Sequence, residues 1–207
     1  KELIDEKTLA DFKIKSLVLT YPEHECKLVK DMNYQDEIDF IVTHPKRNEF
    51  IRDLSLTLKG NTLVLFQFVE KHGSVIHEMI KTKTDRKVFY VFGGTDTKTR
   101  EDIRAITEKE KDAIIVASYG TFSTGINIRN LHNIVFSSPS KSRVRTLQSI
   151  GRGLRRSESK DSATLFDIAD DLTYKSKRNF TINHFLERIN IYNEEQFDYE
   201  IKRIKIK

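Results

Sequence analysis

The chain has 207 residues, of which 38% are hydrophobic and 32% are charged, and its formal net charge is +5. This length and composition suit one globular domain with a charged surface, and they exclude a proline-rich or low-complexity chain. The modest basic excess allows a polyanionic partner without requiring one. Cys26 is the single cysteine, so an intrachain disulfide and a cysteine-based zinc site are excluded. No apolar run approaches the ~20 residues of a membrane-spanning helix.

The first residues, Lys1-Glu-Leu-Ile-Asp-Glu6, lack the apolar core of a signal peptide and an initiator methionine. We therefore expect the chain to be cut from a longer polypeptide. Residues 9–12 are expected to end a helix, and a strand is expected over 14–21, closed by Pro22. Residues 1–33 as a whole are interpreted as a link from a preceding domain plus an edge strand.

Two helices are predicted over residues 34–58, with a break near His44-Pro45. The second of them places Phe50, Leu54 and Leu58 on one face at a spacing of four. Five short apolar runs follow, and each is bounded by polar residues or glycine. They cover residues 62–66, 88–92, 112–117, 133–136 and 163–168.

Segments that can form helices lie between these runs, over residues 69–83, 98–110 and 141–156. Alternation of continuous apolar strands with helices predicts an α/β fold with a parallel sheet buried on both faces. Ligands bind such sheets at the carboxyl ends of the strands. A last helix is expected over 171–192, so that the main domain spans 34–192. Residues 193–207 form a basic C-terminal extension, for which a strand, a helical turn and a tail stay open.

The most informative stretch is Gln148-Ser-Ile-Gly-Arg-Gly-Leu-Arg155. In a helix, Arg152 and Arg155 share one face, and Gln148 lies one turn earlier on the same side. Gly151 and Gly153 each cost about 1 kcal/mol inside a helix, which close approach to another domain or to a phosphate would explain. Paired guanidinium groups fit phosphate oxygens, and such arginines stabilise a transferring γ-phosphoryl group from a separate unit. A solvated basic helix face is the alternative.

This stretch resembles motif VI of the superfamily 2 helicases. Residues 118–128, Ser-Tyr-Gly-Thr-Phe-Ser-Thr-Gly-Ile-Asn-Ile, resemble their motif V, and residues 62–68 resemble motif IV. Residues 92–101 resemble the glycine pair and the Arg-Glu helix start that follow motif IV. The matches keep the family's order over about residues 60–170. The resemblance implies a second RecA-like domain, with a RecA-like parallel sheet sandwiched between helices.

The resemblance also implies a role for individual residues. Ser118 or Thr121 would touch a nucleic-acid phosphate, Gly125 and Asn127 would lie near the ATP ribose and phosphates, and Gly151 would lie close to the nucleotide. Many family members carry Asp where Asn127 stands, and the loop from Ser118 to Gly125 is one residue longer here than in many relatives. Further contacts to nucleic acid are expected, from the following residues: Gln67, Phe68, Lys141 and Arg143. For the last two, a solvated surface is an equal alternative.

Other polar residues are given structural roles. His72 and His77 are interpreted as surface or capping histidines, and no cluster has convincing metal-ligand spacing. The pair Asp170-Asp171 is expected to cap the helix that begins there, with magnesium binding as the alternative. No Gly-x-x-x-x-Gly-Lys-Ser/Thr phosphate loop occurs in the chain. ATP with Mg²⁺ is therefore expected to be held mainly by a first RecA-like domain of the same polypeptide.

The functional hypothesis is an ATP-dependent DNA helicase or translocase whose arginine fingers this chain supplies. The wording of motifs V and VI is similar to that of the recombination helicases of T-even bacteriophages. That similarity implies branched DNA as substrate (forks, Holliday-type junctions and RNA–DNA R-loops) and the cytoplasm of an infected bacterium as location. The alternatives are a RecA-like module that binds nucleic acid without catalysis and the motor part of a restriction or packaging ATPase.

Overall fold

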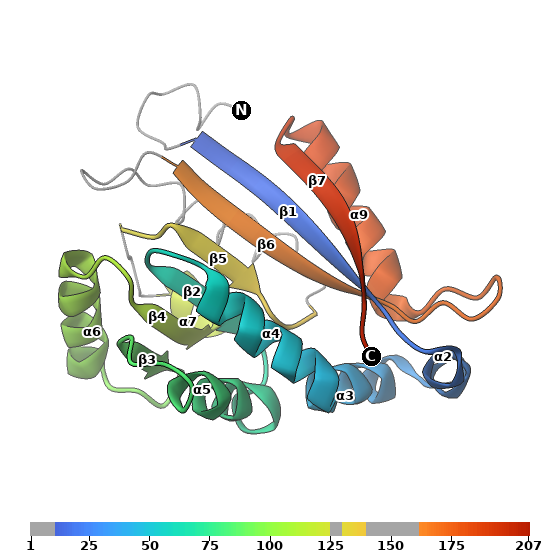
Figure 1. The fold of residues 1–207 in the computed structure, drawn as a ribbon, viewed down its shortest axis with the longest axis horizontal. Coiled ribbons are helices and arrows are strands. Elements are labelled where there is room, and N and C mark those ends of the chain that lie inside the picture. The colour runs from blue at the N-terminus through green and yellow to red at the C-terminus, as the bar shows by residue number, and fades with distance from the viewer. Residues whose placement is uncertain (1–10, 125–129, 140–161) are drawn as a thin grey trace.

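The computed structural model describes residues 11–124, 130–139 and 162–207. Its centre is a sheet in which seven described strands all run parallel, in the order β3-β4-β2-β5-β6-β1-β7 (Figure 1). The strands are β1 (Asp11–Thr20), β2 (Thr62–Phe66), β3 (Val88–Val91), β4 (Ile114–Ser118), β5 (Asn133–Phe136), β6 (Ser162–Asp171) and β7 (Asp198–Lys205). The parallel sheet that the sequence predicts is thus confirmed.

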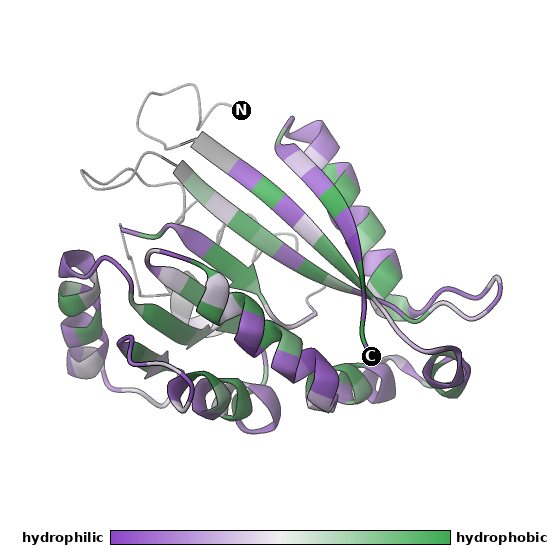
Figure 2. Cartoon of the chain, viewed as in Figure 1, coloured by the Kyte–Doolittle hydropathy of each residue, from purple (hydrophilic) through white to green (hydrophobic). Residues whose placement is uncertain are grey.

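Helices cover both faces of this sheet. The described helices are α2 (Glu23–Val29), α3 (Tyr34–Thr43), α4 (Pro45–Thr57), the π-helix η1 (Val69–Gly73), α5 (Ser74–Lys81), α6 (Thr97–Lys109), α7 (Tyr119–Thr124) and α9 (Phe180–Glu194). One core cluster joins the sheet to α6, α7 and α9, and a second joins it to α2, α3, α4 and α5. Figure 2 marks the green apolar strands between these layers.

The central strands alternate between the two cores. Leu63 and Leu65 of β2 belong to the first cluster, whereas Val64 and Phe66 belong to the second. All four side chains are fully buried. Burial on both faces explains why the run is continuously apolar, because no position of the strand meets water. At ~25 cal/mol per Å² of apolar surface removed from water, such strands supply much of the hydrophobic stabilisation of the fold.

The expected break between α3 and α4 is confirmed. His44 has an extended backbone and accepts a hydrogen bond from the Arg47 amide through its imidazole, while Pro45 takes the first position of α4. Proline suits that position because its missing N–H would have no helical partner. Phe50, Leu54 and Leu58 all pack on the second core, as their spacing predicts.

Several boundary predictions are wrong. Residues 11 and 12 begin β1 rather than end a helix, and β1 lies between β6 and β7 rather than at the sheet's edge. The edge strand is β7, which pairs in parallel with β1 from Lys13↔Asp198 to Thr20↔Lys205. The extension 193–207 thus contributes a strand to the sheet. Both strands lie outside the expected 34–192 core, although the proposed domain limits themselves stay a prediction.

The helix expected over 171–192 begins only at Phe180. Asp170 and Asp171 end β6, so neither caps a helix there, and that prediction is wrong. The α9 amides are satisfied from a distance instead. Glu37 of α3 accepts hydrogen bonds from the backbone N–H groups of Phe180 and Thr181 at 2.9 and 2.8 Å. A buried carboxylate at a helix N-terminus satisfies unpaired amides and complements the helix dipole.

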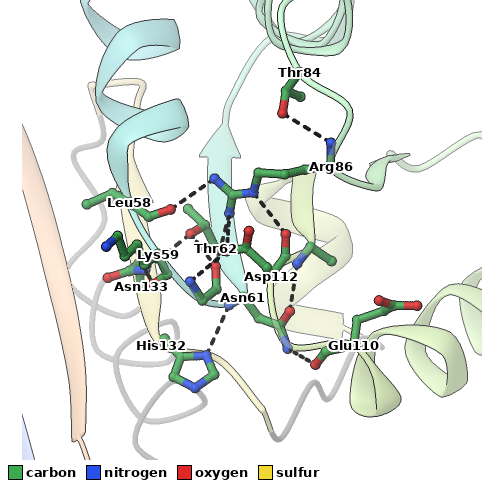
Figure 3. A network of polar contacts seen from close by, with 12 residues as sticks. Leu58, Lys59, Asn61, Thr62, Thr84, Arg86, Glu110, Asp112, His132 and Asn133 are labelled. Atoms are coloured by element: carbon green, nitrogen blue, oxygen red, sulfur yellow. Dashed lines mark hydrogen bonds and ion pairs between the residues drawn. The ribbon is translucent and has the colours of Figure 1, made fainter.

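A polar network fixes the amino edge of the sheet, which is the edge at which the parallel strands begin (Figure 3). The Asn61 side chain donates to the carbonyls of Thr107, Glu110 and Asn130 and accepts from the amide of Ala113. The Arg86 guanidinium donates to carbonyls at the end of α4 and pairs with Asp112 at 3.1 Å. These bonds connect the loops that enter β2, β3 and β4. Ligands bind parallel sheets at the other edge, where the strands end.

Candidate nucleotide and nucleic-acid site

Three adjacent strands bring the expected motifs to one edge of the sheet. In register, Phe66 at the end of β2 is paired with Ser118 at the end of β4. On the other side of β2, the Ser137 amide donates to the Leu65 carbonyl at 3.0 Å, just after β5 ends. The residues that follow β2, β4 and β5 therefore lie side by side, as the parallel topology requires.

Ser138 links these three loops. Its hydroxyl accepts a hydrogen bond from the Gln67 amide at 3.0 Å and lies 2.8 Å from the Nδ1 atom of His72. Its carbonyl accepts from the Tyr119 hydroxyl at 3.2 Å. Sequence reasoning missed this residue. The serine pair directly after the fourth apolar run, at a strand end, is the signal that would have found it.

His72 is fully buried, so its interpretation as a surface or capping residue is wrong. Burial, assisted by the positive charge of Arg47, lowers the pKa of His72 to about 3. Its Nε2 atom has no hydrogen-bond partner among the described residues. The second histidine, His77, is half-buried and stacks on Tyr90 with ring centroids 4.6 Å apart. Among the described residues, neither histidine belongs to a group of three or more side chains that could hold a metal ion.

The π-helix η1 places His72 in this position. The Gly73 amide donates to the Phe68 carbonyl at 2.8 Å, which is the long i→i+5 bond of a π-turn. A Cβ atom on Gly73 would lie 2.4 Å from the buried Phe66 ring, so the chain needs glycine for this close approach. Helical segments of this kind are frequent at functional sites.

The buried imidazole predicts a pH dependence of stability. The unfolded chain binds a proton at His72 below about pH 6.5, whereas the folded chain resists protonation until about pH 3. The stabilising effect of neutral His72 is therefore complete above about pH 6.5 and is lost progressively as the pH falls towards 3. The slope is up to roughly 1.4 kcal/mol per pH unit.

Urea unfolding of the wild type and of His72→Gln at pH 7 and pH 5 measures this effect. Between the two values we expect the wild type to lose roughly 2 kcal/mol more unfolding free energy than the variant. His77→Gln is the matched control and should follow the wild type more closely, because His77 is only half-buried. Equal losses in the wild type and His72→Gln would contradict the assignment.

In the motif V segment, the two hydroxyls expected to touch phosphate bond to each other. Ser118 Oγ and Thr121 Oγ1 are 2.7 Å apart, and the Thr121 amide donates to Ser118 Oγ at 3.3 Å. Both residues are buried, with 9% and 4% of their surface exposed. This bond turns the chain from β4 into α7. Gly125 and Asn127 lie outside the described residues.

The motif IV segment presents more accessible groups. Gln67 and Phe68 follow β2, and both are partly exposed. The Lys71 ammonium lies 5.7 Å from the centre of the Phe68 ring and 2.9 Å from an oxygen of Asp39. An aromatic side chain with a cation on its face, at the carboxyl edge of a sheet, is a suitable neighbour for a sugar-phosphate chain.

Motif VI lies outside the described residues. This applies to all of its expected catalytic and binding residues and to the expected basic track: Gln148, Gly151, Arg152, Arg155, Lys141 and Arg143. Their roles stay predictions. What the structure gives is the frame from which that segment departs and to which it returns, namely the end of β5 and the start of β6.

A buried ion pair braces the carboxyl edge, from which that segment departs. Arg47 of α4 is fully buried and donates to both carboxylate oxygens of Asp170, at 2.7 and 3.1 Å. Its third donor reaches the Ser137 carbonyl at 2.8 Å, and the Tyr21 hydroxyl donates to Asp170 at 2.5 Å. Although burial disfavours its charge, the Asp170 carboxylate keeps the pKa of Arg47 above the ordinary value.

The role of Asp170 is thereby settled as an ion pair rather than a helix cap. Within residues 11–124, 130–139 and 162–207, no group of three or more His, Cys, Asp or Glu side chains is arranged to hold a metal ion. No described helix combines the length and the apolarity needed to cross a membrane.

Comparison with known proteins places the chain in a family. Residues 46–157 match the helicase conserved C-terminal domain. The ATP-dependent DNA helicase uvsW of Enterobacteria phage T4 is 38% identical over 218 residues, which take in 99% of this chain and 43% of that protein. The putative ATP-dependent helicase IRC3 of Saccharomyces cerevisiae is 27% identical over 172 residues, or 81% of this chain and 24% of that protein.

The solved structures agree. The crystal structure of T4 UvsW matches with a TM-score of 0.84 at 37% identity, over 97% of this chain and 43% of that one. The chain therefore spans less than half the length of these relatives. Since the family match takes in more than half of the chain, and the parallel sheet matches that of T4 UvsW, the chain belongs to the helicase conserved C-terminal domain family and is a second RecA-like domain of the superfamily 2 type.

Proposed function

We propose that this chain is the second motor domain of an ATP-dependent DNA helicase or translocase that remodels branched DNA. One observation carries the proposal. The strand β5, which leads into the Gln148–Arg155 stretch, lies beside β2, which carries the motif IV segment, and β4, which carries the motif V segment, lies on the other side of β2. A module that only binds nucleic acid has no use for a glutamine and two arginines at this spacing.

In this proposal the chain supplies one wall of an ATP site. Arg152 and Arg155 reach the γ-phosphate, and Gln148 orients the attacking water. Gly125, Asn127 and Gly151 lie near the nucleotide. Binding of ATP would close the cleft between the two domains, and hydrolysis with release of the products would open it again. ATP and its Mg²⁺ are held mainly by a first RecA-like domain of the same polypeptide, because the present sequence contains no phosphate loop.

The nucleic-acid contacts would be made along the carboxyl edge of the sheet. In the Ser118–Thr121 pair one hydroxyl proton is used in the mutual bond, and the other is left to donate to a phosphate oxygen. Gln67 and Phe68 extend this track at β2, and Lys141 and Arg143 extend it beyond β5. Contacts to sugar and phosphate do not read sequence, and their strength falls with salt.

The substrate class is the finer part of the proposal. The similar phage protein is named as a DNA helicase, which supports DNA as the partner. Forks, Holliday-type junctions and RNA–DNA hybrids are the structures that we expect to be remodelled, in the cytoplasm of a phage-infected bacterium.

The test compares the full-length protein with the isolated 207-residue chain. We expect DNA-stimulated ATP hydrolysis and displacement of a strand from a labelled fork for the full-length protein. For the isolated chain we expect no hydrolysis, because it lacks a phosphate loop, together with weak DNA binding that falls steeply with salt. Hydrolysis by the isolated chain, or salt-independent binding, would contradict the proposed division of labour. A full-length protein without DNA-stimulated hydrolysis would refute the function itself.

A further inference from the structure

A hydrophilic loop joins β6 to α9 and is not part of any helicase motif described above. Residues 172–179 extend from the body of the molecule (Figure 1, orange loop) and are mainly hydrophilic (Figure 2). Tyr174 and Lys177 exchange two backbone hydrogen bonds of 3.0 Å, which close the turn. Lys175 has a positive φ of 52° within it. The side chains of Lys175, Lys177 and Arg178 are exposed.

The Tyr174 ring gathers two of the charges. The ammonium groups of Lys175 and of Lys30, which follows α2, lie 5.5 and 5.8 Å from the centre of this ring. Cation–π attraction of this kind holds a lysine near a ring even at an exposed site. We call Lys30, Lys175, Lys177 and Arg178 the basic turn.

The exposed carboxylate of Asp31 faces this group. Asp31 lies 3.2 Å from the Lys30 ammonium and 4.0 Å from that of Lys177. Its side chain is 73% exposed, and exposed ion pairs of this kind are weak because water screens them. Two further carboxylates, Glu37 and Asp171, line the surface beside this group. Glu37 is buried and bonded to the α9 amides, and Asp171 is paired with Arg203, so the exposed side chains of the turn leave a net positive surface.

The turn lies on the same edge of the sheet as the motif segments. Because all strands are parallel, the segments after β1 and β6 leave the sheet at the edge where Gln67, Ser118 and Ser138 lie. β6 is two strands from β2 and three from β4. At about 4.8 Å per strand, the lateral separation of these strands is roughly 10–15 Å. Phe136 at the end of β5 pairs with Asp167, and β6 continues to Asp171, so the turn also lies farther out along the strand direction than the motif segments.

We propose that the basic turn is a second phosphate-binding site for nucleic acid, which holds a duplex arm that continues beyond the motif IV and motif V contacts. This inference rests on the proposed function. Separate ammonium and guanidinium groups suit phosphates repeated along a backbone. Their position on the edge used by the motifs favours nucleic acid over an acidic protein, which would have no reason to bind in line with that track.

The test uses the full-length protein and a triple variant, Lys175→Asn, Lys177→Gln and Arg178→Gln. Asparagine is chosen at 175 because it tolerates a positive φ better than most residues. The matched control, Lys83→Gln, Lys109→Gln and Lys111→Gln, removes the same charge from exposed positions before β3 and β4, at the opposite edge of the sheet. Binding of a fluorescent forked duplex and of a short single strand is measured by anisotropy from 50 to 200 mM salt.

For the triple variant we expect roughly tenfold weaker binding of the fork and a fall of about 2–3 in the slope of log K against log salt. The affinity for single-stranded DNA, and the rate of ATP hydrolysis at a saturating concentration of single-stranded DNA, should stay within about twofold of the wild type. The control should bind the fork within about twofold of the wild type. If the triple variant and the control bind the fork equally well, the inference is overturned. The same result is expected if the turn binds an acidic protein instead of DNA. If the wild type binds neither DNA, the proposed function fails instead.

Discussion

Replacing Arg152 or Arg155 by alanine in the full-length protein should lower DNA-stimulated ATP hydrolysis by roughly 10³-fold or more. Each arginine is proposed to stabilise negative charge that develops on the γ-phosphoryl oxygens, and alanine offers no donor in its place. DNA binding without nucleotide should stay close to that of the wild type, because the proposed strand contacts belong to other segments. Steady-state hydrolysis and fork binding, measured on the same preparations, separate the two effects.

Lys111→Ala is the charge-matched control for this prediction. It removes a positive charge from an exposed position before β4, at the amino edge of the sheet and away from the Gln148–Arg155 stretch in the sequence. We expect hydrolysis by this variant to stay within a few-fold of the wild type. Near-normal turnover in both Arg152→Ala and Arg155→Ala would remove the arginine-finger assignment. An equal loss in Lys111→Ala would indicate a general effect of charge rather than phosphate contact.

The sequence predicts the central sheet well because burial on both faces leaves a local signal. Each of the strands β2 to β5 is a short apolar run between polar residues, and such a run is recognised without knowing its neighbours. The break at His44-Pro45 is similarly local, since proline fixes the start of a helix by its own geometry.

The part of the sheet that β1 and β7 form is harder to predict, because these two strands are far apart in the sequence. β7 carries mostly exposed residues, such as Ile201 at 51%, so its apolar pattern is weak. It becomes a strand because it pairs with β1, nearly two hundred residues earlier. The start of α9 is set in the same way by Glu37, about 140 residues away. Asn179 is a preferred N-cap residue type, but its side chain makes no capping hydrogen bond, so the carboxylate of Glu37 takes that role.

The candidate site likewise has residues that local sequence signals predict and residues that only long-range contacts reveal. The motif segments are recognised from residue types and order alone, and the structure confirms that motifs IV and V share an edge. Ser138, His72 and Arg47 are missed because their importance lies in which strands they connect. A lone histidine in a helical stretch is typical of a surface, and only its packing under Ser138 makes it a buried neutral group.

Arg47→Met should destabilise the fold by about 3–5 kcal/mol, because it leaves the Asp170 carboxylate buried without its cation. Methionine approximates the length of the lost side chain, so loss of packing contributes little. The Ser137 carbonyl loses its donor as well, which loosens the end of β5 where the motif VI segment departs. Chemical unfolding gives the magnitude, and ATP hydrolysis well below the melting temperature reports the effect on the site.

A double-mutant cycle completes the test of this ion pair. Asp170→Asn keeps an acceptor for the Tyr21 hydroxyl but removes the charge. The double variant should be more stable than the sum of the single losses predicts, by about 1 kcal/mol or more, because the lone buried charge is gone. The exposed pair Lys46–Glu49 serves as control, and Lys46→Met should change stability by less than about 0.5 kcal/mol. Additive losses at Arg47 and Asp170 would mean that the two residues act independently, and α4 would then not brace the edge from which the arginine-bearing segment is presented.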